Sequence, residues 1–326
     1  MIVLSSYLLD ETNNRRIEAA LSAAGGAFIR APEEREDRIA LLDERIGDAD
    51  VLLGGRLSQK QWDRAKKLRW IHVPWAGVNS LLALEDIRRS TIPITNASGV
   101  MSDAVADQVM GCIIMLARDL PAQLRAQERA EWLRYDVESR RRRRLRGLTL
   151  GLLGYGAIGN AVAERGRGFG MHVVALRRNT EQHPPELDRL LGTDELPLLL
   201  ETSDFVVVTL PLNDETRGML GREQFGRMKP GAFLINIARG PIIRQEELVE
   251  ALQSGTLAGA ALDVFEKEPL PADSPLWTMP NVIITPHTAG GYRGFQDVTT
   301  DLFLDNLDRF LHGRPLRNRI DPVRGY

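Results

Sequence analysis

The sequence has one cysteine and no long apolar run. Because Cys112 is alone among 326 residues, an internal disulfide framework and a multi-cysteine metal site are excluded, and we expect no metal. No uncharged apolar stretch approaches the roughly 18 residues that a membrane span needs. Residues 1–9 are apolar but lack the basic segment and the cleavage site of a secretion signal. These absences predict a soluble, cytoplasmic globular protein with no membrane partner.

An excess of charge of one sign is also missing. The chain has 42 lysines and arginines against 44 aspartates and glutamates, a formal net charge of −2. This balance supplies no long-range field to attract nucleic acid, so we expect no nucleic-acid partner. The arginine-rich run 140–144 is accordingly interpreted as a solvated or interface segment. A chain of 326 residues has the length of about two domains.

Short apolar runs alternate with amphipathic segments along most of the chain. We expect strands at residues 2–4, 27–29, 51–53, 70–73, 92–95, 149–153, 173–176, 205–209, 232–237, 258–262 and 282–285. Helices are expected at residues 13–24, 102–120, 157–169, 196–201, 245–254 and 295–312, and Pro121 ends the second of them. Because the strands are continuously apolar, they are typical of parallel sheets covered on both faces. The sequence therefore predicts an α/β fold with two doubly wound parallel-sheet domains and boundaries near residues 100 and 290.

A glycine-rich turn follows the expected strand 149–153 and opens a helix. Its residues are Gly154, Tyr155, Gly156, Ala157, Ile158 and Gly159. The first glycine permits the tight turn, the second lets a pyrophosphate approach the backbone, and the third lets the helix pack close to the strand. The amides of Ala157 and Ile158, at the positive end of the helix, would hold the phosphates. Strand, turn, helix and next strand occur in the required order, so we expect a dinucleotide site rather than a purely structural turn.

Two arginines, Arg177 and Arg178, stand at the end of the next expected strand. An acidic residue there would accept hydrogen bonds from the adenosine ribose, whereas arginine suits a 2′-phosphate. The pair favours NADP(H) over NAD(H) as the cofactor. The alternative is that both side chains are ordinary solvated charges, in which case NAD(H) remains open.

Each of three further expected strands is followed by a polar residue near its carboxyl end, which is where ligands bind in an open α/β sheet. These residues are Arg239, Glu268 and His287. Reduction of a 2-keto acid requires such a set beside a nicotinamide: the arginine binds the substrate carboxylate, the histidine protonates the keto oxygen, and the glutamate stabilises the imidazolium. Each residue taken alone is more typical of a structural or solvated position, so the prediction depends on finding all three together.

Four motifs in this order resemble those of the D-isomer-specific 2-hydroxyacid dehydrogenases. They are the glycine loop, Lys229-Pro-Gly-Ala-Phe-Leu-Ile-Asn-Ile-Ala-Arg-Gly240, Ala261-Leu-Asp-Val-Phe-Glu-Lys-Glu-Pro269 and Asn281-Val-Ile-Ile-Thr-Pro-His287. The resemblance covers essentially the whole chain. It implies Arg239 as the substrate-binding catalytic arginine, His287 as the acid/base and Glu268 as its partner.

The resemblance also implies the rest of the site. Asp263 is expected near the nicotinamide carboxamide, with Ile237 and Ala238 lining the same pocket. The backbone amides of the loop 73–78 are expected to hold the substrate carboxylate, and Trp75 would line the pocket or be an ordinary packed aromatic. The remaining candidates are Leu210, Pro211 and Gly290 for the cofactor and Ala76, Gly77 and Val78 for the substrate.

The family further implies a division of the chain into domains and a dimer. Residues 1–99 and 291–326 would form a discontinuous, flavodoxin-like substrate domain that closes over a central Rossmann cofactor domain, residues 100–290. Segment 120–146 corresponds to the arm that mediates homodimers. Within its arginine-rich part, Trp132 is expected to be the main apolar anchor.

Two positions depart from the family pattern. Arg177 replaces the acidic residue that is usual in NAD-using members, which supports the expected NADP(H) preference. Asp107-Gln108 stands where many members have Glu-His, and the sequence alone offers no account of this difference.

The resulting prediction is an oxidoreductase that transfers a hydride from NADPH, or NADH, to a small 2-keto acid such as glyoxylate or hydroxypyruvate. The product would be the D-2-hydroxy acid where it is chiral. One alternative is a non-catalytic, nucleotide-sensing protein on the same fold, similar to the C-terminal-binding-protein corepressors. A methyltransferase that binds S-adenosylmethionine at the glycine loop is a further alternative, but it has no use for the Arg/Glu/His set.

Overall fold

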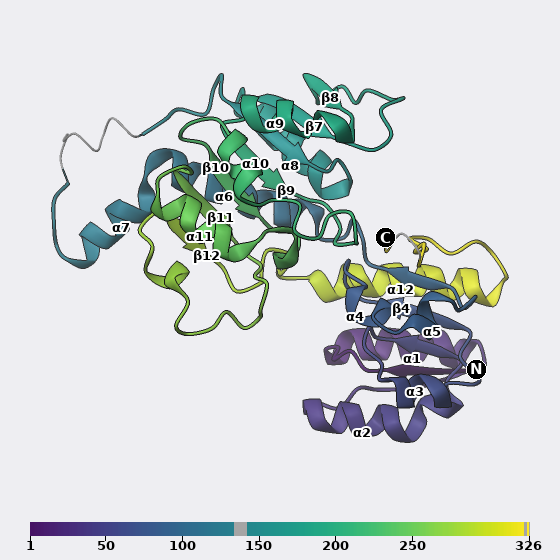
Figure 1. The fold of residues 1–326 in the computed structure, drawn as a ribbon. Helices are drawn as coiled ribbons and strands as arrows, with labels where there is room; N and C mark the ends of the chain where they lie inside the picture. Colours follow the sequence, from purple (N-terminus) through teal and green to yellow (C-terminus); the bar gives the residue numbers. More distant parts are fainter. Residues whose placement is uncertain (134–141, 323–324, 326) are drawn as a thin grey trace. The chain divides into compact units, whose positions relative to one another are not determined.

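The computed structural model describes residues 1–133, 142–322 and 325. The chain forms two compact units: Met1–Met101 with Tyr292–Tyr326, here unit 1, and Ser102–Gly291, here unit 2. In each unit a parallel sheet lies between helices (Figure 1). The predicted α/β fold with two doubly wound parallel sheets is confirmed.

Unit 1 has a five-stranded sheet in the order β2-β1-β3-β4-β5, which is the flavodoxin-like order. Its strands are β1 Ile2–Ser5, β2 Ala27–Ile29, β3 Val51–Leu53, β4 Trp70–Val73 and β5 Ile94–Asn96. Its helices are α1 Glu11–Ala23, α2 Arg35–Arg45, α3 Gln59–Arg64, α4 Asn79–Leu82, α5 Glu85–Arg88 and α12 Phe295–Leu311. The last strand begins at Ile94 rather than Ile92, because Pro93 has no N–H to offer the sheet.

Neighbouring residues along these strands pack on opposite faces of the sheet. Val51 belongs to a cluster with Phe303 of α12. The next residue, Leu52, belongs to a separate cluster with Leu42 of α2 and Leu81 of α4. Because apolar side chains cover both faces, the strands are apolar without alternation, as the sequence pattern predicts.

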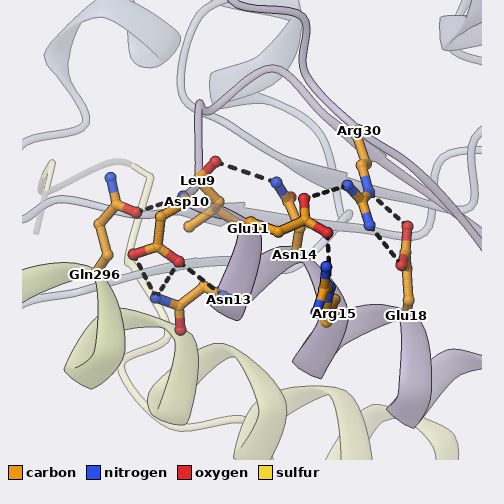
Figure 2. A network of polar contacts seen from close by, with 9 residues as sticks. All are labelled: Leu9, Asp10, Glu11, Asn13, Asn14, Arg15, Glu18, Arg30 and Gln296. Atoms are coloured by element: carbon orange, nitrogen blue, oxygen red, sulfur yellow. Dashed lines mark hydrogen bonds and ion pairs between the residues drawn. The ribbon is translucent and has the colours of Figure 1, made fainter.

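Polar contacts join the first turns of α1 and α12, which lie side by side in unit 1 (Figure 1). The carboxylate of Asp10 caps α1 by accepting the amide of Asn13 at 2.8 Å, and the amide of Asp10 donates to Gln296 at 2.7 Å (Figure 2). The side chain of Asn13 also donates to Asp297 at 2.9 Å. These bonds attach the start of the C-terminal helix to the N-terminal part of the same unit.

Unit 2 has a seven-stranded sheet in the order β12-β11-β10-β9-β6-β7-β8. Its strands are β6 Thr149–Leu153, β7 His172–Leu176, β8 Arg189–Leu191, β9 Phe205–Val208, β10 Phe233–Asn236, β11 Gly259–Leu262 and β12 Val282–Ile284. Its helices are α6 Ser102–Arg118, α7 Leu120–Glu128, α8 Ala157–Gly168, α9 Leu196–Thr202, α10 Arg222–Arg227 and α11 Gln245–Gln253. The direction of winding reverses between β6 and β9, which is the place where doubly wound sheets of this order bind dinucleotides.

Helices cover both faces of this second sheet. On one face α6 and α8 pack against each other and over β6, β10 and β11. On the other face Val206 of β9 lies in one apolar cluster with Leu199 of α9, Phe225 of α10 and Leu248 of α11. Because all seven strands are parallel, their carboxyl ends lie at one edge, and the residues that follow them are brought together there.

The helix expected at 102–120 ends earlier than predicted. Asp119 adopts the left-handed conformation, with φ 54°, and separates α6 from α7. Pro121 lies in the first turn of α7, where the missing amide hydrogen costs no helical bond. The proline therefore marks the start of a second helix as well as the end of the first.

The segment after α7 also differs from the expectation. Trp132 is 91% exposed, so its expected role as an apolar anchor is wrong within this chain. Residues 134–141, which include part of the expected arm 120–146 and of the arginine run 140–144, lie outside the described residues. In the described part of the chain, no helix is long and apolar enough to cross a membrane.

Candidate active site

The glycine loop joins β6 to α8 at the switch point of the unit 2 sheet. Gly154 has φ +105°, a conformation that other residues rarely adopt. A Cβ at Gly159 would lie 2.7 Å from the carbonyl oxygen of Gly154, so only glycine lets the helix approach the turn this closely. A Cβ at Gly156, by contrast, would meet no atom within 4 Å. The loop is therefore tightly packed at its two ends and open at its centre.

Residues after β9 pack beside this loop. The hydroxyl of Thr209 donates to the carbonyl oxygen of Gly154 at 2.8 Å, and Leu210 lies against the same glycine. Pro211 follows, so both cofactor candidates from this strand stand at the edge of the sheet next to the loop. Tyr155 donates its hydroxyl to Asn160 at 2.7 Å. Burial and the charge of Glu186 raise the pKa of Tyr155 to about 12, so its hydroxyl stays protonated.

The two arginines follow β7, the strand beside β6 in the sheet. Both are exposed, and the charge of Arg177 acts on the hydroxyl of Tyr155 in the glycine loop. Arg178 forms an ion pair with Glu215 in the loop after β9. The structure therefore brings both arginines to the edge that carries the glycine loop, and it gives Arg178 an acidic partner that sequence reasoning missed.

His287 and Glu268 are in direct contact. Nδ1 of His287 lies 2.7 Å from Oε2 of Glu268, and the other carboxylate oxygen accepts the amide of Phe265 at 3.1 Å. The side chains of the histidine and the glutamate are 48% and 36% exposed within the chain. Because Nδ1 is engaged by the carboxylate, Nε2 is the ring nitrogen that remains for a substrate.

Arg239 stands at the same edge, after β10. Its guanidinium is largely buried, and this burial lowers the pKa, while the negative charge of nearby Glu268 opposes the effect. The next residue has to be glycine: a Cβ at Gly240 would lie 1.9 Å from the backbone of Phe265. This close approach of two loops places the arginine near the segment that carries the glutamate. The predicted Arg/Glu/His set is thus gathered in one place.

Asp263, at the end of β11, is 2% exposed and surrounded by donors. Its Oδ1 accepts the hydroxyl of Thr285 at 2.6 Å and the amide of Thr288 at 3.0 Å, and its Oδ2 accepts the amide of Ala289 at 3.1 Å. Gln108 of α6 adds a bond to Oδ1 at 3.3 Å. The expected contact of Asp263 with the nicotinamide carboxamide stays a prediction.

Sequence reasoning missed Gln108 and Thr285. The departure from the family pattern at Gln108 was the only signal, and it gave no partner because the contacting residues are more than 150 positions away. Thr285 was included in an expected strand as one more apolar-run residue. Its position two residues before a candidate catalytic histidine is the signal that could have found it.

The other candidates lie as follows. Ile237 and Ala238 are buried after β10, and Gly290 is half-buried after the histidine loop. The substrate candidates Trp75, Ala76, Gly77 and Val78 follow β4 in unit 1. Trp75 is half-buried against the core of that unit and meets Tyr7 edge to face, with ring centroids 6.0 Å apart. Among the described residues, no group of three or more His, Cys, Asp or Glu side chains could hold a metal ion.

A model described as "D-isomer specific 2-hydroxyacid dehydrogenase, NAD binding domain" matches residues 110–289. The chain belongs to this family. It is 35% identical over 287 residues to the glyoxylate reductase of Korarchaeum cryptofilum, covering 83% of this chain and 82% of that protein.

Solved structures of the family are similar along the whole length. A D-isomer specific 2-hydroxyacid dehydrogenase from Xanthobacter autotrophicus, in complex with NADPH and MES, has a TM-score of 0.83 at 32% identity and covers 100% of both chains. The NADPH-dependent glyoxylate/hydroxypyruvate reductase of Sinorhizobium meliloti, in complex with NADP and sulfate, has a TM-score of 0.83 at 25% identity, covering 100% of this chain and 99% of that one. The predicted family is confirmed, and the protein is an NAD(P)-dependent 2-hydroxyacid dehydrogenase. The alternative of a non-catalytic nucleotide sensor is not favoured.

Proposed function

We propose that this dehydrogenase reduces small 2-keto acids, such as glyoxylate or hydroxypyruvate, with NADPH in preference to NADH. The product is the D-2-hydroxy acid where it is chiral. The observation that carries the proposal is the 2.7 Å contact between His287 and Glu268, with Arg239 nearby at the same edge of the sheet. The relatives named glyoxylate reductase support the same class of small substrate.

The glycine loop fits a dinucleotide. Its centre at Gly156 is open, and the first amides of α8, those of Ala157 and Ile158, have no partners within the helix. We propose that these amides hold the pyrophosphate, and that the nicotinamide end is held by Leu210, Pro211, Ile237, Ala238, Asp263 and Gly290. When bound, the reduced nicotinamide supplies the hydride that adds to the keto carbon.

His287 acts as the general acid. Glu268 holds Nδ1 of the ring, which orients Nε2 outward to deliver a proton to the keto oxygen. The amide of Phe265 fixes the other oxygen of the carboxylate, so the glutamate cannot rotate freely. The carboxylate therefore keeps the ring in one orientation, with Nε2 left to transfer the proton.

Arg239 binds the substrate carboxylate and polarises the keto oxygen. A guanidinium offers two parallel N–H donors that match a carboxylate, and the guanidinium stays charged although burial lowers its pKa. Burial also removes water that would compete for the same donors. For the loop Trp75–Val78 of unit 1, we propose that its backbone amides bind the substrate carboxylate.

The preference for NADPH rests on the arginines after β7. Arg177 and Arg178 replace the acidic residue that would accept the ribose hydroxyls, and a 2′-phosphate is a dianion that two guanidinium groups can bind. Arg178 forms an ion pair with Glu215 in this structure. When the 2′-phosphate binds, it replaces the Glu215 carboxylate as the anionic partner of Arg178. The Xanthobacter and Sinorhizobium structures hold NADPH and NADP, respectively.

We further propose that the enzyme is a homodimer, with segment 120–146 as the arm. Leu124, Trp132 and Leu133 in this segment are 51%, 91% and 38% exposed, which is apolar surface suited to a second copy. Light scattering of the wild type and of Trp132→Ser tests this assembly: we expect a dimer that weakens in the variant. A monomeric wild type contradicts it.

The reaction is tested by following the absorbance of reduced nicotinamide with NADPH and with NADH. The substrates are glyoxylate, hydroxypyruvate, pyruvate and bulkier keto acids at matched concentrations. We expect the largest kcat/KM with NADPH as the cofactor and with glyoxylate or hydroxypyruvate as the substrate. Absence of turnover with every keto acid would overturn the proposal, and a higher kcat/KM with NADH would overturn its cofactor part.

A further inference from the structure

The backbone at His287 has a conformation that needs support. Its φ is +56°, in the left-handed region that residues with a side chain rarely adopt. The amide of His287 donates to the carbonyl oxygen of Asp263 at 2.8 Å. The next two amides, those of Thr288 and Ala289, donate to the carboxylate of the same aspartate. One residue therefore holds three consecutive amides of the loop that carries the proposed acid.

The carboxylate of Asp263 is itself held from two other elements. Thr285, after β12, donates its hydroxyl to Oδ1 at 2.6 Å. Gln108, on α6, donates its side-chain amide to Thr285 at 2.9 Å and to Oδ1 at 3.3 Å. The three groups form a chain of hydrogen bonds in one direction: Gln108 donates to the hydroxyl oxygen of Thr285, and this hydroxyl donates to Asp263. α6, β11 and β12 are thus joined at one buried carboxylate.

The neighbours of Gln108 on α6 show that this contact is separate from the packing of the helix. Asp107 and Asp103 point to Arg165 of α8, at 2.7 Å and 3.0 Å. Cys112, one turn after Gln108, is buried, and its burial together with the charge of Asp263 raises its pKa to about 11, so it remains a neutral thiol. The two α6 side chains that act on Asp263, those of Gln108 and Cys112, are therefore both neutral. Of these two, Gln108 has the N–H that donates to the carboxylate.

We propose that Gln108 and Thr285 are positioning residues for His287: they fix the Asp263 carboxylate, which in turn fixes the loop that holds the imidazole against Glu268. This inference rests on the proposed reduction, in which His287 delivers the proton. Without either donor the buried carboxylate is left partly unsatisfied, and the loop can recover free energy by leaving the left-handed conformation. The imidazole then spends less time in contact with Glu268, while the glycine loop on another strand is unaffected.

Matched pairs of variants separate positioning from packing. Thr285→Val removes the hydroxyl and keeps the shape, and Thr285→Ser keeps the hydroxyl. Gln108→Leu removes the amide, and Gln61→Leu removes a comparable Gln-to-Asp bond, at 2.8 Å, in unit 1. We expect kcat to fall at least about tenfold in Thr285→Val and Gln108→Leu, because hydrogen bonds to a charged group are strong. Thr285→Ser and Gln61→Leu should keep kcat within about twofold.

A second measurement needs no turnover. The ring signals of His287 in NMR spectra, assigned with His287→Gln, report its contact with Glu268. We expect these signals to shift and broaden in Thr285→Val and Gln108→Leu and to match the wild type in Thr285→Ser. If the wild type reduces no keto acid, the proposed function fails, and the NMR result still decides on positioning. The melting temperature of Gln108→Leu shows whether this variant is folded. If it is folded and both its ring signals and its kcat match the wild type, the inference is overturned.

Discussion

Replacing Glu268 by glutamine tests the pairing on which the chemistry depends. The amide has nearly the same shape as the carboxylate and can still accept the amide of Phe265, which lies 3.1 Å from Oε1. It carries no negative charge, and with its one oxygen on Phe265 its NH2 group faces Nδ1 of His287, which lies 2.7 Å from Oε2 in the wild type. The change therefore keeps the size of the side chain but removes both its charge and its acceptor for an N–H at Nδ1.

The size of the effect follows from the environment of the pair. A hydrogen bond to a charged group contributes about 1.5–3 kcal/mol when it is shielded from water. Here the two side chains are 48% and 36% exposed within the chain, so solvent screens part of the interaction. Taking about half of the full value gives about 0.75–1.5 kcal/mol, which corresponds to a loss of about 4- to 13-fold in kcat.

The assay is steady-state reduction of glyoxylate by NADPH, and Glu266→Gln is its control. The carboxylate of Glu266 accepts the amide of Gln245 at 3.0 Å, so the same substitution there leaves the histidine untouched. We expect kcat to fall in Glu268→Gln only, with KM for NADPH unchanged in both. Equal kcat values in the two variants would refute the assigned role of Glu268.

Two further predictions concern the cofactor and the stability of unit 1. Arg177→Asp should shift the ratio of kcat/KM from NADPH toward NADH, because a carboxylate accepts the ribose hydroxyls and repels a 2′-phosphate; an unchanged ratio in the two-cofactor assay would remove Arg177 from the account. Burial lowers the pKa of His72 to about 3 from an ordinary value of 6.5. The unfolded chain therefore takes up a proton first as the pH falls, so the contribution of neutral His72 is complete above about pH 6.5 and is lost by about 1.4 kcal/mol per pH unit down to about pH 3. His72→Asn keeps an acceptor for Thr95, which lies 2.8 Å from Nδ1, and should flatten that slope in denaturation curves measured across pH; an unchanged slope would contradict the assignment.

Most of the architecture could be predicted because the strands of a covered parallel sheet are short and continuously apolar. The expected strands at 27–29, 51–53 and 149–153 have the same bounds in the structure. β8 and α10 were missed because both contain charged residues, and neither has an apolar run longer than two residues. The end of α6 was placed two residues late because the left-handed conformation of Asp119 has no sequence signature as strong as that of a glycine.

The site divides in the same way. Arg239, Glu268 and His287 could be predicted because each follows a recognisable strand of one parallel sheet, whose carboxyl ends meet. Gln108 could not, because its partners depend on which face of α6 packs over β10 and β11. Trp132 was misjudged because an aromatic in a polar segment is a core residue only if the chain folds back over it, and here it is 91% exposed.

The central claim is that His287, held by Glu268, delivers the proton when a 2-keto acid is reduced. The most direct measurement compares the wild type with His287→Ala, following both NADPH oxidation with glyoxylate and NADPH binding by nicotinamide fluorescence. The account predicts that binding persists while kcat falls by about 10²–10⁴-fold, the usual worth of a general acid. Near-normal turnover in His287→Ala would contradict it.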